Sequence, residues 1–480
     1  MGKYIAVTIG PIGDTMALSS KPASLWAASY MFSFLAKNIC NALVEDSICT
    51  CNEIVTPYFD PDDPLINRND GVGVFHDHII FRCGKDISAV KDSFAKALSR
   101  TAEAFDVDIG YLQSTVNISA CSFDSDESEI ILRCAKMLDC MELTRRFNSL
   151  ERRNELSAKF SNNEISNTIT EKLGIAAGEF QLFKDGRIKS LAEIAYSKRC
   201  RGYKKNRYFC ILRADGDNMS KIIADLENEQ ECREFSKTCL QYCSNVAAEV
   251  RRFGGVTIYA GGDDLLALTP CENESGETVF DLIGSINKVF SDSFKSCSDN
   301  LSAGIKVGLS FGLFIGYEKF PLYEALDLSA YQLFGIAKDK QKGGKNCIAV
   351  RLQKHSGQSV ELCISNDALD AFNRRLKPAI EQERSKDGTE KVFLSAGQKV
   401  ALFSVLFDNV DSGSASLFRN TFDADFHLSN SASYFHRELP DFFDENITTG
   451  KIRITDSGSR AQVFAAVLRI IKFFVEKEVK

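Results

Sequence analysis

The sequence predicts an α+β protein of several domains. Its 480 residues are 44% hydrophobic and 26% charged, and at about 100–200 residues per domain this length suggests roughly three domains. Two stretches alternate short β-branched or aromatic runs with longer runs of helical period, a pattern typical of sheets covered by helices. From residue 367 onward the periods are helical.

The first stretch, residues 1–133, is expected to form one layered unit. Strands are predicted where β-branched and aromatic residues cluster, over residues 4–9, 78–83 and 116–123. Helices are predicted over residues 14–43 and 86–105. Trp26 has helical spacing to its aromatic neighbours, so we expect it to pack in the core.

Residues 134–205 are polar and helix-prone, and they include the charged run 145–153. A solvated helical connector is the preferred interpretation. Contact of the charged run with nucleic acid is the alternative.

The second stretch, residues 206–358, is expected to form another layered unit. Its strands are predicted over residues 208–212, 256–260, 265–268, 305–317 and 346–352. Its helices are predicted over residues 230–253, 278–297 and 323–338. Residues 359–480 are expected to form an all-helical C-terminal domain with Ser-rich loops.

Three carboxylates of the second stretch suggest chemistry. Asp215 follows a short apolar strand, and Asp263 and Asp264 occupy the tip of a predicted hairpin. Carboxylates placed in this way can hold two divalent ions, Mg²⁺ or Mn²⁺, about 3.5–4 Å apart for phosphoryl transfer. Gly261 and Gly262 allow a positive φ and close approach of a nucleotide. A polar turn is the alternative.

Candidate phosphate-binding residues flank these carboxylates. Gly216, Asp217 and Asn218 lie between a strand and a helix whose amide groups could receive a triphosphate. Three lysines could neutralise phosphate charge: Lys221, Lys338 and Lys345. A solvated basic turn is the alternative for Lys338 and Lys345.

Charge and cysteine content narrow the class of protein. The formal charge is −7, so a nucleic acid would have to meet a local patch or partner subunits. The sequence has 16 cysteines but no C-x-x-C, which favours buried free thiols over zinc ligands. Without a secretory h-region or membrane-length apolar run, we expect a cytoplasmic protein without membrane contact.

The segment from Ile258 to Ala267, together with Leu212 to Met219, resembles the polymerase/cyclase palm of the large subunit of type III CRISPR effector complexes, a family related to the GGDEF cyclases. The segment from Ala337 to Asn346 resembles the phosphate-side motif of those cyclases, and residues 9–30 are similar to the opening of the family's first, inactive palm. The resemblance implies two ferredoxin-like palms, a helical connector and a helical C-terminal domain.

By this resemblance Asp215, Asp263 and Asp264 are metal ligands and catalytic residues, and Gly261 and Gly262 shape the nucleotide site. Ser310 falls near the strand where the family reads adenine, although a structural strand hydroxyl is equally compatible. The implied activity is synthesis of cyclic oligoadenylate from ATP in antiviral defence, by a complex in which CRISPR RNA pairs with target RNA.

The sequence departs from the family pattern in two places. The palm pattern begins at residue 4, so we expect no HD nuclease domain and no DNase activity, and we interpret His76-Asp77 as a loop-to-strand junction. The zinc motif between the palms is missing, and Cys200 alone does not replace it. Three alternatives stay open: joining of AMP to S-adenosylmethionine, a GTP-using cyclase and a catalytically idle scaffold.

Overall fold

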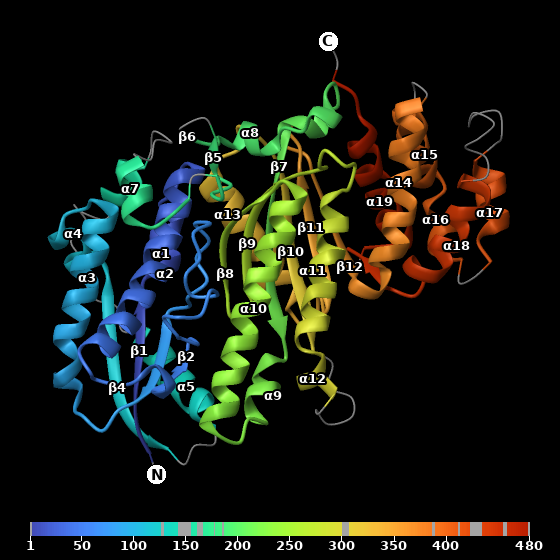
Figure 1. Cartoon of the computed structure of the whole chain (residues 1–480). Coiled ribbons are helices and arrows are strands. Elements are labelled where there is room, and N and C mark those ends of the chain that lie inside the picture. Colours follow the sequence, from blue (N-terminus) through green and yellow to red (C-terminus); the bar gives the residue numbers. More distant parts are fainter. Residues whose placement is uncertain are drawn as a thin grey trace.

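The computed structural model describes residues 2–125, 129–142, 155–160, 167–176, 178–184, 187–299, 307–385, 389–410, 413–422, 434–454 and 458–478. Two sheets, each covered by helices, are followed by a helical C-terminal region (Figure 1). The second sheet lies between the first sheet and the C-terminal helices.

The first unit is built on a four-stranded antiparallel sheet in the order β2-β3-β1-β4. Its strands are β1 (Gly2–Gly10), β2 (Ile54–Thr56), β3 (His78–Arg82) and β4 (Asn117–Ser125). Its helices are α1 (Ile12–Ala17), α2 (Pro22–Glu45), α3 (Lys91–Phe105) and α4 (Ile109–Thr115). Chain order and strand order together give the βαββαβ, ferredoxin-like arrangement.

The second unit repeats this topology and extends it. Strands β7 (Tyr208–Asp217), β8 (Val256–Gly261), β9 (Asp264–Pro270) and β10 (Gly308–Tyr317) form the order β10-β7-β9-β8. Three more strands continue the sheet beyond β10: β11 (Cys347–Gln353), β12 (Ser359–Ser365) and β13 (Ile452–Arg453). Its helices are α9 (Met219–Ala224), α10 (Glu229–Phe253), α11 (Val279–Ser293), α12 (Lys295–Asp299) and α13 (Leu322–Ala330).

Helix α10 shows why the second unit folds as its sequence predicts. The Asn228 side chain caps its N-terminus by accepting from the Glu231 amide, and Gly254 ends it in the left-handed region at φ 92°. Apolar residues at helical spacing, including Cys239, Cys243 and Val246, are buried against the sheet. These two cysteines therefore pack in the core.

The two units share one continuous hydrophobic core. Helix α2 is buried along almost its whole length because it lies between its own sheet and the second unit. The backbone of Gly73 forms a parallel bridge with Tyr259, and the Gly73 carbonyl accepts from the Ala260 amide at 3.0 Å. Trp26 is fully buried as predicted, and its indole donates to the Gly71 carbonyl at 2.7 Å.

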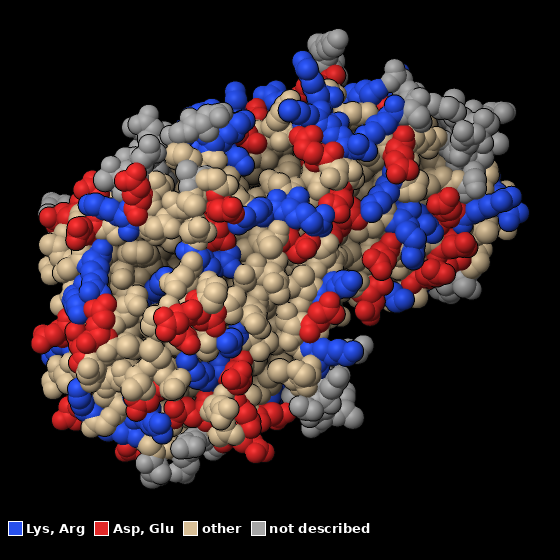
Figure 2. Space-filling model, viewed as in Figure 1, with Lys and Arg blue, Asp and Glu red and all other residues tan. Residues whose placement is uncertain are grey.

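Short elements connect the two units: α5 (Ile130–Glu142), α6 (Glu155–Lys159), α7 (Asn167–Lys172), β5 (Phe183–Lys184), β6 (Arg187–Ile188) and α8 (Leu191–Ala195). The charged run 145–153 that we considered for nucleic-acid contact lies outside the described residues. Figure 2 shows acidic and basic side chains interspersed over the face in view.

The C-terminal region is helical apart from the strands it gives to the second sheet. Its helices are α14 (Leu369–Ser385), α15 (Thr389–Leu402), α16 (Ser404–Asp408), α17 (Ala415–Thr421), α18 (Leu439–Phe442) and α19 (Arg460–Val475). Helix α19 packs against α15 and β12, so the last helix of the chain is an internal element of the protein.

Some predicted elements differ from the structure. The helix predicted over 14–43 is two helices, because residues 18–21 interrupt it before Pro22 begins α2. The helix predicted over 323–338 changes after Ala330 into a π-helical segment, Tyr331–Ala337. Strand β7 continues to Asp217, because residues 213–217 pair with β10. We did not predict β12 and β13.

All 16 cysteines are free thiols in the structure. Within the described ranges, every helix is too short or too polar to cross a membrane.

Candidate active site

Strand pairing brings Asp215 to the hairpin tip. Strands β7 and β9 are antiparallel, and their last pair is Ala214 with Leu265, so Asp215 and Asp264 follow at the same sheet edge. Gly261 pairs with Asp264 across the hairpin, leaving Gly262 and Asp263 as its turn. Gly262 has φ +66°, which a glycine adopts without strain.

Gly216 allows the Asp263 side chain to lie directly over strand β7. A Cβ atom at Gly216 would lie 2.4 Å from Oδ2 of Asp263 and 2.5 Å from Cγ of Met219. The Asp263 carboxylate also accepts a hydrogen bond from the Gly216 amide. The glycine is therefore needed for the carboxylates of Asp215 and Asp263 to approach each other.

Lys338 supplies the cation beside these carboxylates. It follows the π-helical segment, and its ammonium group forms an ion pair with Asp215. The same group donates to the Gly216 carbonyl at 2.7 Å and lies 4.0 Å from Oδ1 of Asp217. The Lys338 side chain is therefore ion-paired and largely buried rather than solvated, and its role in the site stays a prediction.

The side chain of Asp217 is buried behind this edge. Its Oδ2 accepts from the Ser310 hydroxyl at 2.7 Å and from the Asn346 amide at 2.8 Å, whereas Oδ1 has no hydrogen-bond partner. Lys345 donates to Oδ1 of Asn218 at 3.1 Å. The turn before β11 is thereby fastened to the end of β7.

The electrostatics of the site favour positive charge. Desolvation raises the pKa of Asp263 to about 6, and the nearby charge of Asp215 adds to this, while Lys338 opposes it. Desolvation, followed by the charges of Asp263 and Asp215, raises the pKa of Asp264 well above its usual range. Desolvation also raises the pKa of Asp215, although the hydrogen bond from Lys338 counteracts it.

A cavity of about 260 Å³ lies between the two units at this edge. The second unit lines it with Gly261, Gly262, Asp263 and Asp264, and the first unit contributes Asp77 and other residues that precede or begin β3. The carboxylates of Asp263 and Asp264 thus face a space that both units enclose.

Most of the predicted site residues come together at this edge: Asp215, Gly216, Asp217, Asn218, Gly261, Gly262, Asp263, Asp264, Lys338 and Lys345. Ser310 is fully buried and its hydroxyl binds Asp217. The exposed side chain of Lys221 has no interaction with the other members among the described residues.

Two residues that were not predicted as site residues support the site. Asn366, just after β12, donates to the Asn346 side chain and to the Leu309 carbonyl, both at 2.8 Å. Arg213 lies on β7 beside Asp264 and moderates its pKa. Asn346 adjoins the predicted Lys345, but no sequence pattern indicates Asn366, because its strand was not predicted.

The donor set fits divalent metal ions. Asp215, Asp263 and Asp264 offer only carboxylate oxygens, which Mg²⁺ and Mn²⁺ prefer, and the buried Oδ1 of Asp217, which accepts no hydrogen bond from the described residues, lies nearby. The raised pKa values of Asp263 and Asp264 reflect desolvation first and the charges of neighbouring carboxylates second, and a bound cation would offset both.

Two family models match parts of this chain. Residues 208–349 match the family model of the Cas10/Cmr2 second palm domain, and residues 4–103 match that of the CRISPR-associated protein Cmr2 N-terminal region. The chain belongs to the Cas10/Cmr2 family. Residues 4–103 span β1 to α3 and residues 208–349 span β7 to β11, so the two matches include strands of both sheets.

A relative from Pyrococcus furiosus, the CRISPR system Cmr subunit Cmr2, is 30% identical over 214 residues. This alignment covers 39% of the chain and 23% of the relative, so the chain matches less than a quarter of that protein's length.

Several solved structures resemble this chain over nearly its whole length. A chain of the Csm1–Csm4 cassette in complex with cA4 has a TM-score of 0.57 at 14% identity, over 99% of this chain and 70% of that one. A chain of the type III-B Cmr-beta complex in its apo state has a TM-score of 0.58 at 12% identity, over 99% of this chain and 82% of that one. At this level of identity the likeness establishes the fold alone.

Proposed function

We propose that the chain is a nucleotidyltransferase of a type III CRISPR effector complex that converts ATP into cyclic oligoadenylate when guide RNA pairs with target RNA. The position of Asp215, Asp263 and Asp264 at one sheet edge, where Asp263 and Asp264 line a cavity, carries this proposal. The relatives support it: one Csm1–Csm4 cassette was solved with cA4 and another with AMPPNP.

In this proposal the three carboxylates would hold two divalent ions. The ions would supply charge stabilisation at the α-phosphate and lower the pKa of the attacking 3′-hydroxyl. Lys338 is placed to donate to a phosphate oxygen as well as to Asp215. Gly262 leaves open space for a nucleotide, whereas Gly261 packs against the Tyr259 ring. Asp217, held by Ser310 and Asn346, fixes the end of β7.

The partners of the chain are part of the proposal. The related structures contain Csm4 or the other components of a Cmr complex. We propose that this chain likewise assembles with further subunits, which carry the CRISPR RNA and the target RNA. An acidic net charge of −7 suits such a division of roles.

Mass spectrometry of the products formed from ATP tests the function. The complex reconstituted with guide and target RNA is given ATP with Mg²⁺ or Mn²⁺, and S-adenosylmethionine is added to a parallel tube. In both tubes we expect pyrophosphate and a product whose mass is a multiple of that of AMP less one water. An adduct only in the second tube would instead identify AMP conjugation, and no product in either would leave a scaffold.

Replacing the hairpin carboxylates tests the metal assignment. We expect D263A/D264A to abolish product formation without loss of assembly, because the ions lose two ligands. The matched variant D292A, at an exposed position of α11, should keep full activity. Synthesis that survives in D263A/D264A would refute the assignment.

A further inference from the structure

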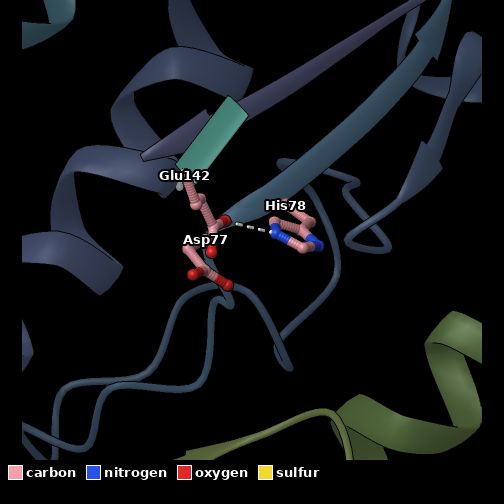
Figure 3. A group of neighbouring side chains, drawn as sticks. All are labelled: Asp77, His78 and Glu142. Atoms are coloured by element: carbon pink, nitrogen blue, oxygen red, sulfur yellow. Dashed lines mark hydrogen bonds and ion pairs between the residues drawn. The ribbon is translucent and has the colours of Figure 1, made fainter. Parts of the chain in front are cut away.

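A second group of metal-ligating side chains lies in the first unit, opposite the proposed catalytic carboxylates. Asp77 and His78 come from the start of β3, and Glu142 from the last residue of α5. One ligand atom of each lies within 4.8 Å of the other two. Figure 3 shows the His78 ring directed at Glu142, with the Asp77 carboxylate beside that pair.

Hydrogen bonds orient this group. Nε2 of His78 lies 2.8 Å from Oε1 of Glu142, and the Thr8 hydroxyl of β1 donates to the same oxygen. A neighbouring hydroxyl that fixes a carboxylate is typical support for a metal ligand. The three ligands come from two elements that are distant in the sequence, so only the fold assembles them.

The group opens onto two cavities. Asp77 lines two cavities, one of about 480 Å³ in the first unit and the one of about 260 Å³ that reaches Asp263 and Asp264. Glu142 and Asp14 also line the larger cavity. Among the described residues that line either cavity there is no Lys or Arg. Two carboxylates so close together favour a bound cation.

We propose that Asp77, His78 and Glu142 bind one divalent cation of the Mn²⁺ type, separate from the ions of the second unit. Two carboxylates and one imidazole form a mixed oxygen and nitrogen donor set, which suits first-row transition ions better than Mg²⁺.

The position of this cation gives it a role toward the second substrate. A nucleotide acceptor carries phosphates, and the acidic wall of the first unit repels them unless a cation lies between. The ion held by Asp77, His78 and Glu142 is placed to bridge that wall and an acceptor phosphate. This role rests on the proposed function, whereas the cation site rests on the cluster alone.

Pulsed electron paramagnetic resonance of Mn²⁺ bound to the intact chain, without nucleotide, distinguishes the two sites. The proposed ligands of the second unit are carboxylates, so a ¹⁴N coupling that is lost in H78A and kept in H76A, the other imidazole at the shared cavity, comes from His78. We expect this coupling in the wild type and its loss in H78A. Bound Mn²⁺ without a nitrogen coupling would overturn the proposal, whatever the chain's activity.

Stoichiometry gives an independent measurement. In the D215N/D263N/D264N background we expect one Mn²⁺ per chain, bound at least tenfold more weakly after D77N or E142Q. D14N removes a charge from the same cavity without touching the group and should leave binding unchanged. Circular dichroism checks that each variant folds. No bound Mn²⁺ in the triple variant, or equal binding in D77N, would overturn the proposal.

Discussion

Gly216 is the residue on which the geometry of the proposed site depends most directly. A methyl group there meets the Asp263 carboxylate at 2.4 Å and Met219 at 2.5 Å, so one of them must move. We expect G216A to lower the rate of product formation about a hundredfold, because a shift of about 1 Å in a catalytic group has an effect of that order.

The matched control for G216A is G284A, on α11, where a new Cβ atom would meet only Leu369 at an ordinary 3.8 Å. That variant should keep full activity and gain up to about 1 kcal/mol of stability, since alanine favours a helix over glycine. Steady-state product formation and urea denaturation compare the two variants. Full activity in G216A would show that Asp263 does not need its observed position.

Asp263 is expected to destabilise the metal-free fold. Its pKa is about 6 in the folded chain against an ordinary value of 3.8, so the folded state binds more protons between these values. Stability therefore falls as the pH rises from about 4 to about 6, and the loss persists at higher pH. Asparagine removes this charge.

We therefore expect D263N to unfold at higher urea than the wild type at pH 7.5 in EDTA, by on the order of 1–2 kcal/mol. At pH 4 the two proteins should be equal, because both are then uncharged at this position in the folded state. If D263N is less stable than the wild type at pH 7.5, the ionised Asp263 carboxylate does not destabilise the metal-free fold.

At the scale of elements, a buried ion pair connects the second unit to the C-terminal helices. Lys205 and Glu272 are fully buried, with 2.5 Å between Nζ and Oε2, and Arg384 of α14 also pairs with Glu272. Removing one partner of a buried pair leaves an uncompensated charge. We expect E272A to lower the free energy of unfolding by about 3–5 kcal/mol.

Urea denaturation measures this effect. The control E274A removes an exposed carboxylate two residues away and should cost less than about 1 kcal/mol. K205M in the E272A background should restore part of the lost stability, since it removes the unpaired ammonium. An E272A effect no larger than that of E274A would mean that the pair does not stabilise this junction.

At the scale of the whole molecule, Arg233 fastens the two units together. It lies on α10, and its guanidinium donates to three carbonyls of the first unit, those of Cys51, Ile54 and Phe59, at 2.6–2.9 Å. We expect R233A to weaken the junction by about 3 kcal/mol, since hydrogen bonds from a charged donor are each worth about 1.5–3 kcal/mol and the losses overlap.

Limited proteolysis and urea denaturation read out this change. The wild type is expected to unfold in one transition because its core is continuous, whereas R233A should show earlier cleavage between the units. R252A, which removes exposed ion pairs on the same helix, is the control and should behave like the wild type. Identical cleavage of R233A and the wild type would show that Arg233 does not stabilise the junction between the two units.

The local sequence pattern determined many of the strands, turns and helices of this protein. The strands around Asp215 and the hairpin with Gly261 to Asp264 are predictable because β-branched runs, glycine turns and capped amphipathic helices are encoded by neighbouring residues. The resemblance to type III large subunits rests on the same short motifs, and the family matches confirm it.

Tertiary structure alone decided which side chains meet. Strand β12 was not predicted, although it places Asn366 against Asn346. The group of Asp77, His78 and Glu142 needs β3 and α5, which are more than 40 residues apart, and Lys338 reaches Asp215 across more than 100 residues. Such contacts depend on sheet order and helix packing, which are cooperative properties of the whole chain and leave no periodic signal in the sequence.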